Sequence, residues 1–233
     1  MFVADYIETS LLDWEGKISC VLFLSGCNFR CPWCQNRELA LGKIENRISV
    51  VDIIKKFKSK KNWIDGFVIT GGEPTVNPNL KKIITEIKNN GFKVKIDTNG
   101  SNPDIIKNLI YEGIIDCVAI DIKTSLDKSK YNNACGIKVD LDAVERTIDM
   151  LLNVDKSVEV MFRTTLVSGI VDIEDVKEIV KRVKDKKYYI QKFISRNTLD
   201  EKYLNIETYS EAKIQEIRKI VDEKNIKRVV VGL

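Results

Sequence analysis

The sequence predicts an α/β protein built as a partial barrel of six βα units, (β/α)6, in a single domain. Short runs rich in β-branched and aromatic residues alternate with longer segments of helical period, as in βα units around a parallel sheet. The chain has 233 residues, which one α/β barrel often fills. Its composition, 44% hydrophobic and 31% charged, is typical of a globular protein. Six units are fewer than the eight of a closed barrel, and a doubly wound sheet is the alternative.

Strands are predicted at short apolar runs, and helices where apolar residues recur every three or four positions. The expected strands are 18–24, 66–70, 92–97, 115–121, 158–167 and 187–193. The expected helices are 49–60, 78–90, 103–112, 140–152, 173–185 and 208–224. In both candidate folds, ligands bind at the carboxyl ends of the strands, so the loops after strands hold the candidate site residues.

The helix over 78–90 has the clearest boundaries. Asn77 is its predicted N-cap, with Pro78 at the first helical position. Asn89, Asn90 and Gly91 are expected to end it.

The remaining segments lie at the two ends of the chain. Residues 1–17 are expected to form a cap that leads into the first strand, and residues 18–224 form the partial barrel. Residues 225–233 are expected to be a C-terminal edge segment, in which 227–233 add a short strand.

Histidine is absent from the sequence, and its absence excludes several mechanisms. The chain itself cannot build a Ser-His-Asp or Cys-His catalytic centre, an H-E-x-x-H zinc site or an imidazole general base. The net charge is +4 with the charges interspersed, so nothing supports binding to nucleic acid or to a membrane surface. Neither a signal peptide nor an apolar run of membrane-spanning length is evident, and we expect a cytoplasmic protein.

Three of the six cysteines are clustered. Cys27, Cys31 and Cys34 have the spacing Cys-x3-Cys-x2-Cys directly after the first predicted strand. Three thiolates on one loop can hold three corners of a [4Fe–4S] cluster and leave one iron open. A structural zinc site or an electron-transfer cluster normally has four ligands, although a non-catalytic iron–sulfur or zinc-binding module remains an alternative. The other cysteines are interpreted as core thiols, since free cysteine is commonly buried: Cys20, Cys117 and Cys135.

The cysteine loop resembles the signature of the radical S-adenosylmethionine (SAM) superfamily, in which an aromatic residue precedes the last cysteine, as Trp33 does here. The resemblance implies a partial (β/α)6 barrel with one [4Fe–4S] cluster on Cys27, Cys31 and Cys34, whose open iron chelates the amino and carboxylate groups of SAM. An electron from the reduced cluster cleaves SAM to methionine and a 5'-deoxyadenosyl radical, which abstracts a hydrogen atom without a histidine base. Trp33 is the candidate adenine contact.

Gly71, Gly72 and Glu73 follow the second predicted strand. Glycines let the backbone approach a ligand closely, and a carboxylate can pair with an ammonium group. The segment resembles the G-G-E motif of the same superfamily, which implies that it holds the amino group of SAM.

The third and fourth predicted strands end in polar residues. Asp97, Thr98 and Asn99 follow the third, while Asp121 and Lys123 lie at the end of the fourth and point to the same side. Both segments resemble the D-T-N-G and D-x-K motifs of the branch that activates glycyl radical enzymes. The resemblance implies that Lys123 binds the SAM carboxylate and that the aspartates and Thr98 lie near the ribose or a monovalent cation. A turn and a strand-end ion pair are the structural alternative.

The last two strands add further candidates. Arg163 lies among apolar neighbours and therefore needs a partner, either SAM or an ordering ion pair. Gln191 or Lys192 is expected to approach the adenosyl end, where relatives often place a histidine. Gln35 likewise stands where related activating proteins usually have histidine.

Residues 8–36 resemble the activating proteins of anaerobic ribonucleoside-triphosphate reductase and, more loosely, of pyruvate formate-lyase. The resemblance implies an activase whose 5'-deoxyadenosyl radical removes a Cα hydrogen from one glycine of a large partner, a glycyl radical enzyme. A reduced flavodoxin or ferredoxin would supply the electron. The alternative is a radical SAM enzyme that acts on a small molecule, such as a pterin or deazaguanine precursor.

Overall fold

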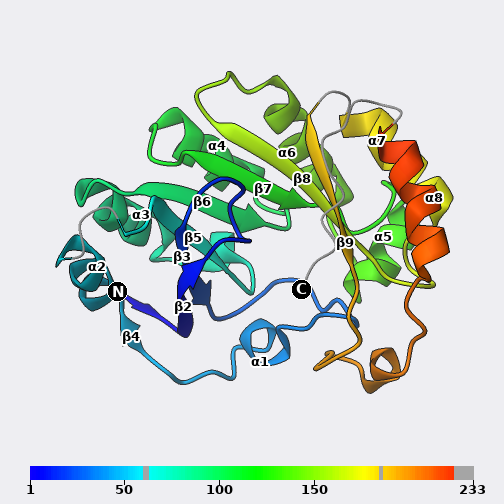
Figure 1. Ribbon diagram of the computed structural model, residues 1–233, viewed down its shortest axis with the longest axis horizontal. Helices are drawn as coiled ribbons and strands as arrows, with labels where there is room; N and C mark the ends of the chain where they lie inside the picture. Colours follow the sequence, from blue (N-terminus) through cyan, green and yellow to red (C-terminus); the bar gives the residue numbers. More distant parts are fainter. Residues whose placement is uncertain (60–62, 184–185, 223–233) are drawn as a thin grey trace.

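One seven-stranded sheet organises the computed structural model, which describes residues 1–59, 63–183 and 186–222 (Figure 1). Its spatial order is β2 (Asp5–Ser10), β3 (Ser19–Leu24), β5 (Gly66–Gly71), β6 (Lys93–Thr98), β7 (Cys117–Asp121), β8 (Glu159–Leu166) and β9 (Lys187–Lys192). The strands from β3 to β9 are parallel, and β2 pairs antiparallel with β3. A separate two-stranded ribbon joins β1 (Phe2–Val3) and β4 (Ile48–Ser49).

The parallel strands follow one another in space in the same order as in the sequence. This order is that of a barrel wall, whereas a doubly wound sheet reverses its strand order. The predicted partial (β/α)6 barrel is therefore confirmed, and the doubly wound alternative is wrong. Every predicted parallel strand is present, with its ends shifted by at most two residues. Strands such as β3 are apolar almost throughout because both faces of the sheet are covered.

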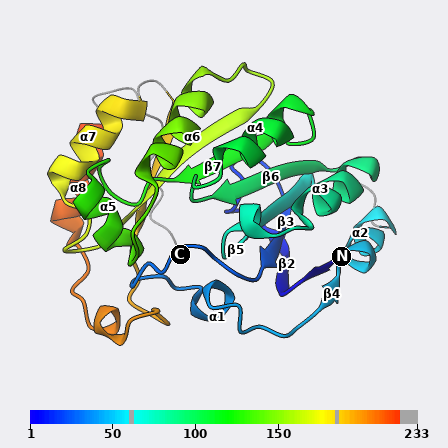
Figure 2. The same cartoon turned by 180° about the vertical axis from the view of Figure 1, so that it is seen from behind.

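The helices lie on the outer face of the sheet, as Figure 2 shows for α3, α4 and α6. The predicted helices appear as α2 (Val50–Ser59), α3 (Leu80–Asn89), α4 (Pro103–Tyr111), α6 (Leu141–Asn153), α7 (Ile173–Val183) and α8 (Glu211–Asp222). Shorter elements that the sequence did not predict are α1 (Arg37–Ala40), α5 (Lys128–Cys135) and the 3-10 turns η1 (Pro74–Val76) and η2 (Glu201–Leu204). None of the helices in the described ranges has the length and apolar character needed to cross a bilayer.

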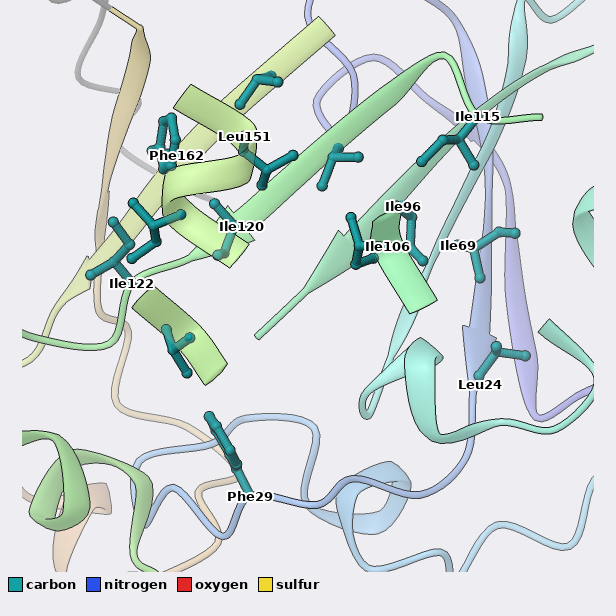
Figure 3. Close-up of a cluster of buried hydrophobic side chains, with 14 of the residues drawn as sticks. Leu24, Phe29, Ile69, Ile96, Ile106, Ile115, Ile120, Ile122, Leu151 and Phe162 are labelled. Atoms are coloured by element: carbon teal, nitrogen blue, oxygen red, sulfur yellow. The ribbon is translucent and has the colours of Figure 1, made fainter. Parts of the chain in front are cut away.

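The main core lies between the sheet and these helices (Figure 3). Ile96 of β6 and Ile120 of β7 are fully buried in the same cluster as Ile106 of α4 and Leu151 of α6. Phe29, from the loop after β3, points toward this cluster as well. Burying each such side chain contributes roughly 1.5–3 kcal/mol, so the core fixes both the strand order and one side of the cysteine loop.

A smaller apolar cluster fills the inner face of the sheet. Trp14, from the loop after β2, packs with Val68, Ala119 and Met161, and its Nε1 donates a hydrogen bond to Glu159 Oε2 at 3.1 Å. In Figure 1 this loop, in dark blue, passes in front of the sheet. The segment predicted as a cap therefore contributes strand β2 and an aromatic plug to the barrel interior.

The start of α3 differs from the prediction. The side chain of Asn77 is not an N-cap: its Oδ1 accepts the N–H of Asn79 at 2.9 Å in a local turn, and the helix begins at Leu80. Pro78 therefore precedes the helix. The predicted end is confirmed, since Asn90 is the C-cap and Gly91 follows with a φ of +84°.

The predicted edge strand over 227–233 lies outside the described residues. The division of the chain into a cap, a barrel and an edge segment stays a prediction.

Candidate functional site

A cavity of about 360 Å³ lies at the carboxyl ends of the parallel strands. The cysteines predicted to bind the cluster and the residues predicted to bind SAM all line it, and each of the parallel strands from β3 to β9 contributes through its end or the loop after it. These residues are Cys27, Cys31, Trp33, Cys34, Gly71, Gly72, Glu73, Asp97, Thr98, Asn99, Asp121, Lys123, Arg163 and Gln191. The fold thus brings these predicted site residues together.

The cysteine loop is locked to the turn that follows β5. Gly26 begins the loop with a φ of +94°, its N–H donates to the carbonyl of Leu39 at 2.7 Å, and its carbonyl accepts the N–H of Glu73 at 2.8 Å. A Cβ on Gly72 would lie 2.0 Å from the carbonyl oxygen of Gly26. Only glycine therefore allows these two loops to pack at this distance.

Helix α5 supports the cysteine loop from another side. The N–H of Arg30 donates to the carbonyl of Cys135 at 2.9 Å, and Trp33 Nε1 donates to the carbonyl of Ala134 at 3.0 Å. Gly136 caps the helix with a φ of +66°, and a Cβ there would lie 2.2 Å from the carbonyl oxygen of Arg30. The last turn of α5 is thus fitted to the backbone of the loop.

The segment after β9 holds the same loop. The N–H of Leu199 donates to the carbonyl of Cys34 at 3.0 Å, and that of Asp200 donates to the carbonyl of Pro32 at 2.8 Å. The cysteine loop is therefore held by backbone contacts from segments that follow it by more than a hundred residues.

Gln35 and Asn36 extend this support. Gln35 Nε2 donates a hydrogen bond to the carbonyl of Ile194, and its own carbonyl accepts Asn197 Nδ2 at 3.2 Å. Asn36 Nδ2 donates to the carbonyl of Gly71 at 3.1 Å. At the position where related activating proteins usually carry histidine, this chain uses an amide that ties the cysteine loop to the segment after β9.

The three thiols fit a cluster better than a single ion. Burial raises the pKa of Cys27 to about 11 and raises that of Cys34, whereas a hydrogen bond with the Cys135 thiol lowers the pKa of Cys31. Within the described ranges, no group of three His, Cys, Asp or Glu residues is arranged to hold one metal ion. A [4Fe–4S] cluster offers each thiolate its own iron, so three thiols around a cavity suit it. The N–H of Phe29 already donates to Cys27 Sγ at 3.3 Å, a type of contact that tunes such clusters.

Glu73 is buried behind the Gly71–Gly72 turn. Its Oε1 accepts Thr75 N–H at 3.1 Å, Thr75 Oγ1 at 2.5 Å and Thr98 Oγ1 at 2.8 Å, while Oε2 accepts Asn99 N–H at 2.7 Å. Burial raises the pKa of this carboxyl group. A carboxylate oxygen can accept more than one hydrogen bond, and Oε2 accepts only that of Asn99 among the described residues, so it has capacity for a ligand ammonium group.

Trp33 belongs to the cysteine loop and contacts both α5 and Lys123. Its side chain is buried, its Nε1 is bonded to Ala134, and the Lys123 Nζ lies 5.4 Å from its ring centroid. A cation at this distance from an aromatic face is stabilised by the ring quadrupole. The indole therefore orders Lys123 at the cavity, and its contact with adenine stays a prediction.

A network of charges crosses the floor of the cavity. Arg163 Nη1 lies 2.9 Å from Asp97 Oδ2, and Arg163 Nε lies 2.8 Å from Asp121 Oδ1. Asp121 and Arg163 are direct partners in the β7–β8 register, and Lys123 Nζ lies 3.3 Å from Asp121 Oδ2. Arg163 thus has ion-pair partners, and its proximity to SAM stays a prediction.

This network keeps Asp121, Lys123 and Arg163 charged. Burial alone would raise the pKa of Asp121, but Arg163 and Lys123 lower it below its ordinary value. Burial alone would lower the pKa of Lys123 and of Arg163, but Asp121 raises both. The cavity therefore presents fixed cations, which suits a ligand that carries a carboxylate.

Lys95 is part of the network and was not predicted from the sequence. It is 1% exposed, and its Nζ lies 2.5 Å from Asp97 Oδ1 and 2.7 Å from the carbonyl oxygen of Asp13. The signal was its spacing, because residues two apart on a strand share a face and Lys95 precedes Asp97 by two. Lys192, in contrast, is not among the cavity residues and pairs with Glu211 at 3.3 Å, so only Gln191 of the two candidates lines the cavity.

The remaining cysteines are fully buried, as predicted. Cys20 and Cys117 lie in the apolar clusters on the outer and inner faces of the sheet. Cys135 differs, because its thiol hydrogen-bonds to Cys31 and so contacts the predicted cluster site.

The fold and the cysteine loop are those of a radical SAM enzyme, and comparison with known proteins agrees: residues 21–183 match the radical SAM superfamily. The chain belongs to this superfamily, which implies one [4Fe–4S] cluster and SAM. A Methanocaldococcus jannaschii protein named "Putative glycyl-radical enzyme activating enzyme" is 36% identical, over 98% of this chain and 95% of that protein. A second protein of the same organism and description is 28% identical, over 93% of this chain and 81% of its own length.

Other relatives match over shorter ranges or only in fold. The 7-carboxy-7-deazaguanine synthase of Aquifex aeolicus is 38% identical over 88 residues, which are 37% of this chain and 38% of that enzyme. Streptococcus suis SuiB bound to its precursor peptide SuiA superposes with a TM-score of 0.69 at 17% identity, over 91% of this chain and 48% of SuiB. A structure of TYW1 with a lysine-pyruvate adduct has a TM-score of 0.61 at 19% identity, over 93% of this chain and 82% of that one.

Proposed function

We propose that this radical SAM enzyme is an activase that abstracts a glycine Cα hydrogen from a partner glycyl radical enzyme, with anaerobic ribonucleoside-triphosphate reductase as the first candidate partner. The observation that carries the proposal is the 36% identity with a relative described as such an activating enzyme, over nearly the full length of both chains. The D-T-N-G and D-x-K segments, which suggested this branch, line the same cavity as the cysteines.

In the proposed reaction, different residues around the cavity have different roles. Cys27, Cys31 and Cys34 would hold the [4Fe–4S] cluster, which when bound and reduced supplies the electron for cleavage of SAM to a 5'-deoxyadenosyl radical. Glu73 Oε2 would accept the amino group of SAM, and Lys123 would bind its carboxylate. Hydrogen abstraction by a radical requires no imidazole base, which is consistent with a chain that has no histidine.

A second cavity offers a route for a protein substrate. It has a volume of about 310 Å³ and shares Asp13, Arg163 and Gln191 with the first. Leu11 and Leu12 line it and are 68% and 65% exposed. We propose that a glycine-bearing loop of the partner passes over these leucines, since exposed apolar side chains beside a cavity are typical of interaction sites.

The test is electron spin resonance after anaerobic reconstitution, with a reduced flavodoxin or ferredoxin as electron donor and SAM present. A glycyl radical should form on the candidate partner only when this chain, SAM and the reductant are all present. Cleavage of SAM to 5'-deoxyadenosine without a radical on any candidate glycyl radical enzyme would contradict the proposed function while leaving radical SAM chemistry intact.

A charged variant separates partner docking from chemistry. Leu12→Asp should lower the rate of glycyl radical formation about tenfold while SAM affinity is unchanged, because interface hot spots typically cost at least that much. The matched control is Tyr111→Asp on α4, where an aromatic side chain is 91% exposed and does not line either cavity. Equal losses in both variants would contradict the proposed route.

A second candidate function is conversion of a small molecule, favoured by the partial matches to 7-carboxy-7-deazaguanine synthases. Turnover of a pterin or deazaguanine precursor by the reconstituted enzyme, without any partner protein, would support it over the activase.

A further inference from the structure

Two carboxylates at the cavity, on Asp97 and Asp121, are candidates for a monovalent cation site. Such an ion would need their oxygens as ligands, since carboxylate and carbonyl oxygens are the donors that hard cations take. The four carboxylate oxygens are already paired with side-chain nitrogens of this chain. Lys95 lies 2.5 Å from Asp97 Oδ1, Arg163 lies 2.9 Å from Asp97 Oδ2 and 2.8 Å from Asp121 Oδ1, and Lys123 lies 3.3 Å from Asp121 Oδ2.

The charge balance of this network also opposes an added cation. Three cationic side chains face two carboxylates, so the network carries one net positive charge. Lys95, Asp97 and Arg163 have side-chain exposures of 1%, 7% and 15%, and buried like charges repel strongly. An ion at either aspartate would lie beside an ammonium or guanidinium group on the same oxygen.

The ammonium group of Lys95 occupies a position that a structural metal cation could fill. Its ammonium group bridges the Asp97 carboxylate on β6 and the backbone carbonyl of Asp13 on the loop after β2. One oxygen of the Asp13 carboxylate, Oδ2, accepts Ser10 Oγ at 2.5 Å. A metal cation could bring together these two oxygen atoms from separate segments. In this chain the buried ammonium group of Lys95 does so.

We propose that Lys95, together with Arg163, takes the place of a monovalent metal ion in this chain, so that SAM binding requires no such ion. The inference rests on the proposed placement of SAM over this cavity. It is independent of which partner or substrate the radical attacks.

The first test uses the reconstituted holoenzyme and measures the equilibrium dissociation constant of SAM anaerobically. Sodium chloride, potassium chloride and tetramethylammonium chloride serve in turn as the sole salt at one ionic strength. The constants should agree within about twofold. Binding more than about tenfold tighter with sodium or potassium than with tetramethylammonium would overturn the proposal.

A variant tests the role of Lys95 itself. Lys95→Met leaves Asp97 Oδ1 without its cation, so SAM binding should weaken about tenfold or more in tetramethylammonium and recover at least severalfold when sodium or potassium replaces it. A merely structural defect would not respond to the size of the salt cation. The matched control is Lys93→Met, at the exposed start of the same strand, which should bind SAM like the parent in every salt.

Weakened binding that no small cation restores, or binding equal to that of the parent, would show that Lys95 does not substitute for an ion. Should Lys95→Met fail to fold, as judged by its thermal unfolding, the salt dependence of the parent decides the proposal alone. Because no partner protein is present, a failed activase assay does not affect either result.

Discussion

Individual cysteines differ in this chain by what surrounds their sulfur atoms. Cys31 lines the cavity, and its sulfur is hydrogen-bonded to the Cys135 thiol. Cys20 is fully buried in the core, and burial raises the pKa of its thiol to about 12. Cys20 is enclosed by core side chains and does not line the cavity, so its sulfur is not placed to bind a cluster there.

Replacing each of these two cysteines should therefore have different effects. Cys31→Ala should lose most of the iron that the parent binds after anaerobic reconstitution, because one cluster corner loses its ligand. Cys20→Ala, a change of the same size at a buried site, should keep the full iron content and lose about 1 kcal/mol of unfolding free energy. Iron and sulfide analysis together with chemical denaturation measures both. A full cluster in Cys31→Ala would refute the ligand assignment.

Among the elements, helix α5 contacts the site at two places. Its last turn fits against the cysteine loop, and the Tyr131 hydroxyl on the same helix accepts the N–H of Lys123 at 3.4 Å. One eight-residue helix thus supports both a predicted cluster ligand and a predicted SAM ligand.

Gly136→Ala tests this support. Gly136 and Gly113 have nearly the same backbone conformation, with φ values of +66° and +65°, but a Cβ added at Gly136 would lie 2.2 Å from a carbonyl oxygen, while one at Gly113 would meet open space. Each substitution costs about 1 kcal/mol for the backbone conformation. Gly136→Ala should in addition displace the cysteine loop and shorten cluster retention, followed by the decay of iron–sulfur absorbance in the presence of a chelator. Equal retention in Gly136→Ala and Gly113→Ala would contradict the role of α5.

The length and composition of each element explain whether the sequence could predict it. The parallel strands were predictable because burial on both faces requires nearly continuous apolar runs, such as Val21 to Leu24 in β3. Helix α5 was missed because Lys128–Cys135 is short, rich in Lys and Asn, and lacks a clear apolar stripe. It is stabilised by tertiary contacts at Tyr131 and Cys135, which no local pattern reveals.

Most residues of the candidate site could also be predicted from the sequence. The candidates at strand ends were predicted from the rule that ligands bind there, and all of them except Lys192, the alternative to Gln191, line the cavity. Lys95 was missed because a lysine in a strand is usually exposed. Its spacing places it on the same face as Asp97, but only the folded chain brings it to the carbonyl of Asp13.

At the scale of the whole molecule, carboxyl groups that pair with cations couple folding to pH. The folded-state pKa values of Asp121, Asp175 and Glu159 lie below their ordinary values, in each case because cations or hydrogen bonds outweigh burial. Such a carboxyl contributes stability above its unfolded pKa, and that stability is lost as the pH falls toward the folded one. Glu73, whose folded pKa is raised, acts in the opposite direction.

The thermal unfolding midpoint of the cluster-free chain should therefore fall as the pH decreases below about 4, near the unfolded pKa of aspartate. Asp121→Asn should unfold at a lower temperature than the parent at pH 6. The difference should shrink toward pH 3, because the unfolded parent then binds a proton at Asp121 that the folded parent, with its lowered pKa, does not bind. A difference that is constant across this range would show that Asp121 does not contribute through its charge.

The backbone contacts of the cysteine loop have a consequence for the timing of biosynthesis. The loop over 27–34 is made early, but its partners include Cys135 and the N–H groups of Leu199 and Asp200. At about 5–20 residues per second, a ribosome needs on the order of 10–30 s to reach the last of them after the cysteines. Until then the three thiols are exposed on a nascent chain that lacks the segments that enclose them. A cluster delivered at that stage would bind to an incompletely folded site.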